Sequence, residues 1–288
     1  MIEPGPMDHL QAESHWTDSD LPAVDWLGNA LSCAACEHAD LNAQGLCQRM
    51  RSCVHDRYAK RIDRFFSQHP ALAARYIDHP YFEVRAVAAK FLDVFHLNRL
   101  VSDSDETVRA SVALRLPSHL LHKLIYDPDR EVRIRVALRL PEAELGSLLY
   151  DSDYYVRVIV ARRIAPTQLF YLMHDADASV RREVAERIGM DWLPLLANDS
   201  AQEVRLTAIR RLPVTMLPAF RRDADWRIRF EVVLRIAPEF LADMSRDRDE
   251  AVAMAAVARL HPHLQAPVPS HPNEPKESVH GDQYRTRQ

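Results

Sequence analysis

The fold is decided by residues 103–126, which read DSDETVRASVALRLPSHLLHKLIY. The next 24 residues, 127–150, read DPDREVRIRVALRLPEAELGSLLY and repeat the same pattern. The valine of its Val-Arg pair, replaced once by isoleucine, recurs every 24 residues, at Val84, Val108, Val132, Val156, Val180, Val204, Ile228 and Val252. A fixed period of this length is the signature of a repeat protein. We therefore predict eight consecutive units with no insertion between them.

Each unit is predicted to begin with an α-helix. Asp103 and Glu106 have the spacing of a capping box, and Pro128 stands where the first residue of the next helix is expected. Apolar residues four apart, such as Val108 and Val112, lie along one stripe of a helix of about three turns. Because proline lacks the amide donor, it ends this helix. The prolines in question are Pro117, Pro141, Pro166, Pro213, Pro238 and Pro262.

The second half of each unit is shorter. Two leucines three residues apart, Leu121 and Leu124 in the quoted unit, suit a short 3₁₀-helix. One unit cannot bury its apolar side chains alone, so the units must stack into an all-α solenoid. HEAT-type repeats share part of the pattern but have a period of about 40 residues. The HEAT fold is therefore the alternative.

Composition excludes several classes of protein. Only 6 of the 288 residues are glycine, and none of them forms a phosphate-binding loop. The formal net charge of −4 is not that of a polycation. Residues 1–20 are acidic and contain no apolar run, so we expect no signal peptide. No stretch of about 18 apolar residues is present, so we expect no membrane span and a cytoplasmic location.

All four cysteines lie close together, at Cys33, Cys36, Cys47 and Cys53. In a reducing compartment such a cluster indicates a metal site rather than disulfides. Four thiolates suit either one tetrahedral Zn²⁺ or an iron–sulfur cluster, and the spacing leaves both open.

Charged and polar residues flank these cysteines. His38 and His55 could replace a thiolate in a Cys3His zinc site, although solvated neighbours are the simpler interpretation. Arg49, Arg51 and Arg57 would offset the negative charge of a thiolate-bound cluster or bind an acidic partner.

Arginines recur in two columns of the repeat. The column that follows the valine is predicted to pair with aspartates of a neighbouring unit, which disfavours a track for nucleic-acid phosphates. The column six residues later is the better candidate for surface contacts. Tyr126 and Tyr150 share a third column, with Tyr154 and Tyr155 beside it, and form our candidate patch for a protein partner.

The pattern from Asp103 to Leu124 and its copies, over residues 79–262, resembles the leucine-rich repeat variant family. The cysteine-rich head resembles the N-terminal domain of the same family. The resemblance implies a right-handed superhelix of alternating α- and 3₁₀-helices. It also implies a [4Fe-4S] cluster held by the four cysteines, and an accessory role in nitrogen fixation.

We therefore predict a disordered N-terminus at 1–20, a cysteine-rich domain with a degenerate capping repeat at 21–77, a solenoid at 78–262 and a disordered tail at 263–288. The expected function is non-enzymatic: the [4Fe-4S] head transfers electrons or senses redox state or iron, and the solenoid binds a protein. One alternative is a zinc-clipped HEAT-like scaffold with lyase or chaperone activity. Another is a nucleic-acid-binding solenoid.

Overall fold

The computed structural model describes residues 21–262. The segments 1–20 and 263–288, for which disorder is predicted, lie outside the described residues. The chain divides after Trp192 into two compact units.

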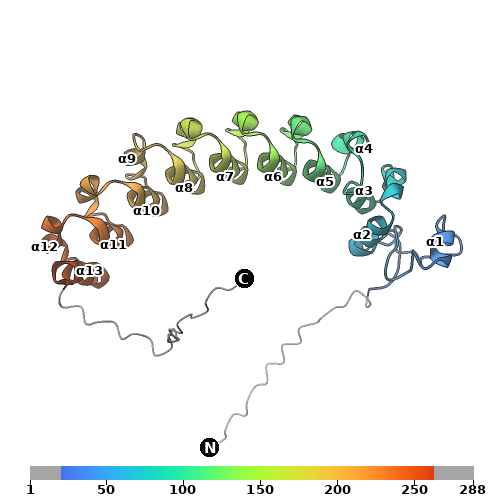
Figure 1. Cartoon of the computed structure of the whole chain (residues 1–288), viewed down its shortest axis with the longest axis horizontal. Helices are drawn as coiled ribbons and strands as arrows, with labels where there is room; N and C mark the ends of the chain where they lie inside the picture. Colours follow the sequence, from blue (N-terminus) through green and yellow to red (C-terminus); the bar gives the residue numbers. More distant parts are fainter. Residues whose placement is uncertain (1–20, 263–288) are drawn as a thin grey trace, which may run out of the picture. The chain divides into compact units, whose positions relative to one another are not determined.

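In the first unit, α-helices alternate with 3₁₀-helices along the chain (Figure 1). The row of α-helices and the row of 3₁₀-helices form two layers. Within residues 21–192 the elements are α1 (Ala39–Ala43), α2 (Ala59–Gln68), η1 (Pro70–Tyr76), α3 (Phe82–Ala88), α4 (Val94–Arg99), η2 (Leu100–Ser102), α5 (Glu106–Arg115), η3 (Ser118–Leu124), α6 (Arg130–Arg139), η4 (Glu142–Leu148), α7 (Tyr154–Arg163), η5 (Pro166–Leu172) and α8 (Ala178–Arg187).

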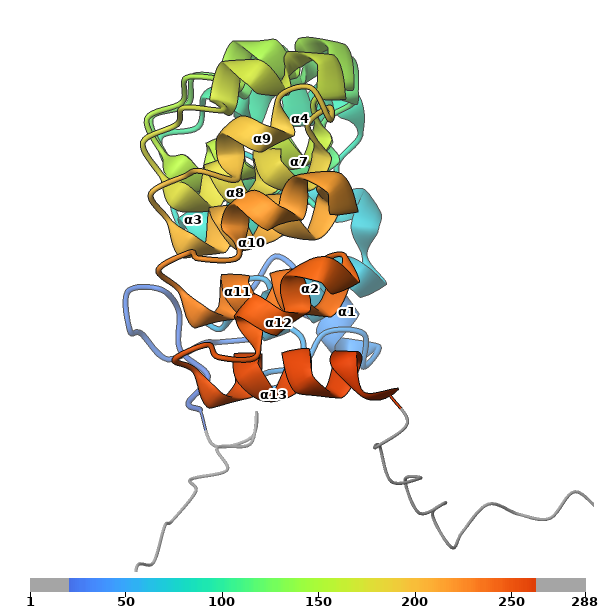
Figure 2. The ribbon, with the colours of Figure 1, turned by 90° about the vertical axis from the view of Figure 1, so that its left-hand side faces the viewer.

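The second unit continues the arrangement, with short α-helices in two of its connections. Its elements are α9 (Leu193–Leu196), α10 (Gln202–Arg211), η6 (Val214–Phe220), α11 (Trp226–Arg235), η7 (Pro238–Phe240), α12 (Leu241–Met244) and α13 (Glu250–Leu260). Figure 2 shows α10, α11 and α13 lengthwise, lying side by side. Among the described residues the only β-type pairings are two isolated bridges in the cysteine-rich segment.

The predicted apolar columns form the core of both layers. Val108 and Val112 on α5 are fully buried, as is Leu116, which follows this helix. Leu121 and Leu124 on η3 are buried as well. A 3₁₀-helix brings residues three apart onto the same side, so both leucines face the α-helical layer. The expectation of a short 3₁₀ segment is confirmed for η3, η4, η5 and η6, whereas the short α-helices α4, α9 and α12 occupy the equivalent place in the other repeats.

The start of each helix differs from the prediction. The N-cap of α5 is Asp105, whose carboxylate accepts a hydrogen bond from the backbone N–H of Thr107 (2.8 Å). Asp103 is not the cap, because its Oδ1 accepts the N–H of Asp105 and so forms the turn before the helix. Pro128 likewise lies before the N-cap of α6 and not at its first position. The capping-box interpretation was wrong, because the N-cap lies two residues after the aspartate that was predicted to form it.

Asp103 and its equivalents join successive repeats. Asp127 accepts hydrogen bonds from Nε (2.7 Å) and Nη2 (2.9 Å) of Arg109 in the preceding repeat. Nη1 of Arg109 donates to the carbonyl oxygen of Asp103 (2.8 Å), within its own repeat. The same bidentate pairing recurs in Arg85–Asp103, Arg133–Asp151, Arg157–Asp175, Arg205–Asp223 and Arg229–Asp247. The predicted ladder of Asp–Arg pairs between successive repeats is confirmed.

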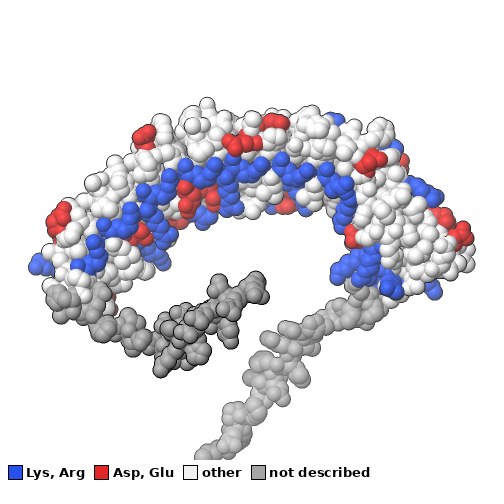
Figure 3. All heavy atoms as spheres, in the orientation of Figure 1, with Lys and Arg blue, Asp and Glu red and all other residues white. Residues whose placement is uncertain are grey.

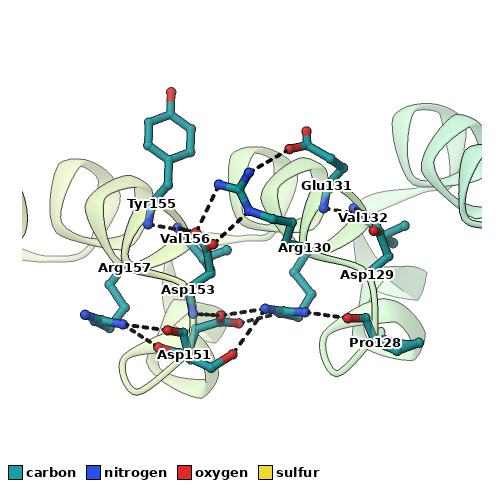
Figure 4. Close-up of polar contacts among 12 residues, drawn as sticks. Pro128, Asp129, Arg130, Glu131, Val132, Asp151, Asp153, Tyr155, Val156 and Arg157 are labelled. Carbon is teal, nitrogen blue, oxygen red and sulfur yellow. Dashed lines mark hydrogen bonds and ion pairs between the residues drawn. The ribbon is translucent and has the colours of Figure 1, made fainter.

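The second aspartate, where the repeat has one, has a separate task, shown in Figure 4; before α10, Ala201 stands in its place. Asp153, the N-cap of α7, accepts from the backbone N–H groups of Tyr155 (2.8 Å) and Val156 (3.3 Å). In this repeat it also accepts from Nε of Arg130 (2.7 Å). The Asp-x-Asp sequence therefore uses one carboxylate to connect repeats and the other to begin the helix.

The arginine in the last turn of α5 to α8, α11 and α13 also connects repeats. Arg187 donates to the carbonyl oxygens of Ala161 (2.6 Å) and Ile164 (2.9 Å) in the preceding repeat. In the second unit, Arg259 makes the equivalent contacts with Val233 and Ile236. These carbonyls stand at a helix C-terminus, where they lack an intrahelical partner. Over α5–α8, Lys and Arg side chains form a band along the α-helical row (Figure 3). The column expected to make surface contacts therefore also helps to hold the stack together.

Candidate metal centre

The four cysteines lie in two tight loops of the cysteine-rich segment. Cys33 and Cys36 belong to the turn before α1, in which the Cys36 N–H donates to the Cys33 carbonyl oxygen (3.4 Å). Cys47 and Cys53 flank a turn closed by two backbone hydrogen bonds between Gln48 and Ser52 (both 2.9 Å). The two loops bring all four thiols to the wall of one cavity.

Local contacts after α1 position Cys47. Gly45, with φ of +73°, adopts the left-handed conformation that ends the helix. The amide of Asn42 then donates from Nδ2 to the Cys47 carbonyl oxygen (2.6 Å). Met50 has a φ of +65° at the tip of the next turn, a conformation that is uncommon for a residue with a side chain. The turn is strained there, and it directs Cys47 and Cys53 to the same cavity.

The burial and the pKa shifts of these thiols indicate whether the cavity suits a metal. Cys47 and Cys53 are buried, whereas Cys33 and Cys36 are partly exposed. Burial raises the pKa of Cys36. The pKa of Cys53 is also raised, by a hydrogen bond shared with Cys47 and by burial, and the same hydrogen bond lowers the pKa of Cys47. Four thiolates cannot share this cavity without a cationic group, and soft thiolates fit iron–sulfur clusters or zinc.

Backbone amides face two of the sulfurs. The N–H of His38 donates to Cys36 Sγ (3.4 Å). The backbone N–H of His55 likewise donates to Cys53 and acts to lower its pKa. In both cases the donor stands two residues after the cysteine. Hydrogen bonds to ligand sulfurs stabilise the thiolate and are one of the features that tune an iron–sulfur centre.

The two histidines belong to a polar network beside the cysteines. His38 is only 4% exposed, and its Nε2 is hydrogen-bonded to Tyr76 Oη. The Tyr76 hydroxyl donates to Glu37 Oε1 (2.8 Å), and His55 Nε2 lies 3.2 Å from Glu37 Oε2. The prediction of solvated neighbours is therefore wrong for His38. Burial lowers its pKa, which favours the neutral imidazole.

Sequence reasoning missed Glu37 and Tyr76 as parts of this site. Glu37 carries a partial signal, because it follows Cys36 directly. Tyr76 stands on η1, 39 residues from Glu37 in sequence, and no motif connects the two. Cys36 Sγ, a Glu37 carboxylate oxygen and a His55 ring nitrogen lie within 4.8 Å of one another. The thiols are thus surrounded on one side by hydrogen-bonding groups.

The predicted arginines lie around the site at different places. Nη1 of Arg49 donates to the carbonyl oxygen of Leu31 (3.2 Å), a residue that lines the same cavity. All three arginines are exposed. Arg49 is therefore the one of the three whose hydrogen bond places its charge at the wall of the site.

A buried ion pair connects the cysteine loops to the first long helix. Arg61 on α2 donates from Nη1 to Asp56 Oδ2 (2.9 Å) and from Nη2 to the Leu21 carbonyl oxygen (2.7 Å), and both charged side chains are fully buried. By sequence, Arg61 is the repeat equivalent of Arg85. The residue 18 positions later is His79 instead of aspartate, so the ladder partner is missing and Arg61 pairs within the head instead.

The tyrosines proposed as a partner patch are on the surface of the first unit. Tyr126 is 81% exposed and Tyr150 is 78% exposed, each immediately before the aspartate that connects two repeats. Tyr154 and Tyr155 lie at the start of α7 and are also exposed. The structure thus presents all four side chains to solvent.

Comparisons with known proteins agree with this description. Residues 23–75 match a family described as "LRV protein FeS4 cluster". A solved structure, "A leucine-rich repeat variant with a novel repetitive protein structural motif", is 39% identical, covers 80% of this chain and 99% of its own, and has a TM-score of 0.77. A protein of Rhodobacter capsulatus named "Uncharacterized 27.7 kDa protein in nifB 3'region" is 50% identical over 95 residues. That match spans 33% of this chain and only 39% of the relative.

These matches agree with the two parts of the sequence prediction. The matched cysteine segment supports an iron–sulfur-binding protein, and the repeats are those of the variant fold and not of HEAT-type helix pairs. Within residues 21–262, every helix is too short or too polar to cross a membrane. The chain belongs to the leucine-rich repeat variant family.

Proposed function

We propose that Cys33, Cys36, Cys47 and Cys53 together hold one [4Fe-4S] cluster. The observation that carries this proposal is that all four thiols of the chain line a single cavity within the segment that matches the iron–sulfur family. When bound there, such a cluster supplies one-electron transfer. The protein's own groups hold the thiolates, donate backbone N–H groups to two of them and partly cover the cavity.

The arrangement favours electron transfer or redox sensing over catalysis. Four cysteine ligands fill one coordination position on each of four irons, so no iron is left open for substrate. Cys33 and Cys36 are partly exposed, which keeps one side of the cavity near the surface. Electron exchange with a docked protein needs this proximity, and a purely structural clip does not. The non-enzymatic function predicted from the sequence is therefore the one we propose.

The repeats are proposed to supply specificity for a protein partner. The arginines that follow the valine column are paired with aspartates, so this column is not a free track for phosphates. Exposed aromatic side chains such as Tyr126 and Tyr150 are the residue type that contributes most to protein interfaces. The relative encoded beside nifB suggests a context of nitrogen fixation, and we extend that context to this chain as part of the proposal.

A redox titration of the anaerobically purified full chain, followed by electron paramagnetic resonance, tests the proposed role. We expect one reversible one-electron transition. Arg49→Gln removes a positive charge at the cavity wall and should lower the reduction potential, because reduction adds negative charge to the site. Lys123→Gln, on η3, is the matched control and should leave the potential unchanged. A cluster that cannot be reduced or oxidised reversibly would contradict the redox proposal and leave a structural role.

A further inference from the structure

Two neighbouring grooves on the first unit are bounded by exposed aromatic side chains. The first, of about 410 Å³, is lined by Tyr126 and Tyr150, with Arg133 and Asp151 also in its wall. The second, of about 340 Å³, is lined by Tyr150, Tyr171 and His174. Tyr150 belongs to both, so the grooves are consecutive and lie one repeat apart.

The charged groups in these grooves are already satisfied. Arg133 donates from Nε (2.8 Å) and Nη2 (3.0 Å) to Asp151, and its Nη1 donates to the Asp127 carbonyl oxygen (2.9 Å). Arg157 and Asp175 form the same bidentate pair in the second groove. A polyanion would have to break these pairs to bind. The grooves therefore offer no unpaired arginine to a polyanion, and a ligand would bind mainly between the aromatic rings.

A polyproline II helix is the kind of peptide that binds aromatic-lined grooves, because it is preformed and loses little entropy. It advances about 3.1 Å per residue, or about 9.3 Å for every three residues. Packed helices lie about 8–10 Å apart, which is the expected spacing of one repeat from the next. Every third residue of such a peptide would then meet an equivalent groove.

The chain contains a segment with this spacing. Residues 267–275 read PVPSHPNEP, with proline at three positions separated by three residues, Pro269, Pro272 and Pro275. In a polyproline II helix these three rings lie on one side. The segment lies outside the described residues, so its match to the grooves rests on the sequence.

We propose that the grooves between Tyr126, Tyr150 and Tyr171 bind the proline segment 267–275 of a second copy of this chain. Two successive prolines of the triplet occupy the two grooves, with Tyr150 as the wall that both grooves share. Bound in this way, the segment covers the tyrosine surface that we assign to a protein partner and competes with that partner. The inference does not depend on the cluster.

A fluorescently labelled peptide of residues 264–277 tests the pairing by fluorescence anisotropy. The receptor is the full chain with Pro269→Ala, Pro272→Ala and Pro275→Ala, which removes competition from its own tail. We expect saturable binding that is weakened about tenfold or more by Tyr150→Ala, since a central aromatic is a typical hot spot. Tyr154→Ala is the matched control, because Tyr154 is 45% exposed but lines neither groove.

Two further measurements make the result decisive. A peptide in which all three prolines are alanine should not bind, and a peptide with one extra alanine between Pro269 and Pro272 should bind more weakly. Circular dichroism checks that Tyr150→Ala is folded. Equal binding of the alanine peptide, no effect of Tyr150→Ala, or no saturable binding would overturn the inference. The assay has no iron readout, so its failure would leave the proposed role of the head untouched.

Discussion

The cysteine-rich head and the repeats are held together in different ways. In the repeats, each type of contact recurs: the Arg109–Asp127 pair has equivalents along the chain, and each buried valine stands in a column of similar residues. In the head, contacts such as Arg61–Asp56 and Tyr76–Glu37 occur once. Loss of one contact in the repeats therefore leaves several equivalent contacts in place. Loss of one contact in the head leaves no equivalent. The predictions below test this difference, from the largest expected effect to the smallest.

Replacement of one cysteine should have the largest effect on the head. We expect Cys36→Ser to lose most of the bound iron, because three thiolates no longer complete the ligand set. The repeats should keep their helicity, since the core of α5–α8 contains no residue of the cavity. Ser32→Ala, in the same cavity wall, is the control and should retain iron. A large loss of the circular dichroism signal at 222 nm in Cys36→Ser would show that head and repeats are not the separate domains we propose.

In the repeats, the largest effect is expected from the core. Leu140→Ala removes a fully buried side chain and should lower the free energy of unfolding by about 2–5 kcal/mol. Leu138→Ala, two residues earlier and 54% exposed, should change it by less than about 0.5 kcal/mol. Urea unfolding followed by circular dichroism measures both. Equal destabilisation by the two variants would contradict the assignment of the buried stripe.

A single rung of the ladder should have an intermediate effect. Asp151→Asn keeps the size of the side chain but removes the charge that binds Arg133 through two hydrogen bonds. Charge-assisted hydrogen bonds of this kind contribute about 1.5–3 kcal/mol. Asp243→Asn is the control, because its contact with Arg221 is longer (3.4 Å) and exposed. Urea midpoints that are the same for both variants would show that the ladder does not stabilise the stack.

The smallest expected effect is the response of the ladder to acid. Burial acts to raise the pKa of Asp103 and Asp175. The hydrogen bonds from Arg85 and Arg157, the backbone N–H groups of Asp105 and Asp177 and the nearby arginine charges together outweigh burial and leave both pKa values lowered. A carboxyl group with a lowered pKa stabilises the folded state above its unfolded pKa, about 3.9, and loses this contribution as the pH falls through the folded value. Thermal unfolding temperatures should therefore decrease as the pH falls below about 4. Constant values from pH 5 to pH 2 would contradict this expectation.

The two regions also differ in how far their sequences predict them. The repeat period, the buried columns and the pairing of arginines with aspartates of the next unit all follow from recurrence, because eight copies show which positions are fixed. The N-cap was misplaced from Asp105 to Asp103, since two aspartates two residues apart are both plausible caps until the backbone of the turn is known. Pro128 was misplaced for the same reason.

In the head, the sequence predicts which residues we propose as metal ligands but not what surrounds them. The cysteine spacing identifies Cys33 to Cys53 as a cluster, and the structure brings these thiols to one cavity. The burial of His38 beneath Tyr76 depends on the docking of η1 against the cysteine loops. That docking consists of long-range contacts that no other repeat copies, so sequence alone gives no signal for it.

The most direct test of the central claim is the content of iron, acid-labile sulfide and zinc in the full chain purified without oxygen. Four thiols at one cavity in this family predict about four irons and four sulfides per chain, with little zinc. Cys47→Ser should lower iron and sulfide together, because Cys47 is a buried member of the ligand set. One zinc per chain with no sulfide would contradict the account and indicate a structural zinc site in the head.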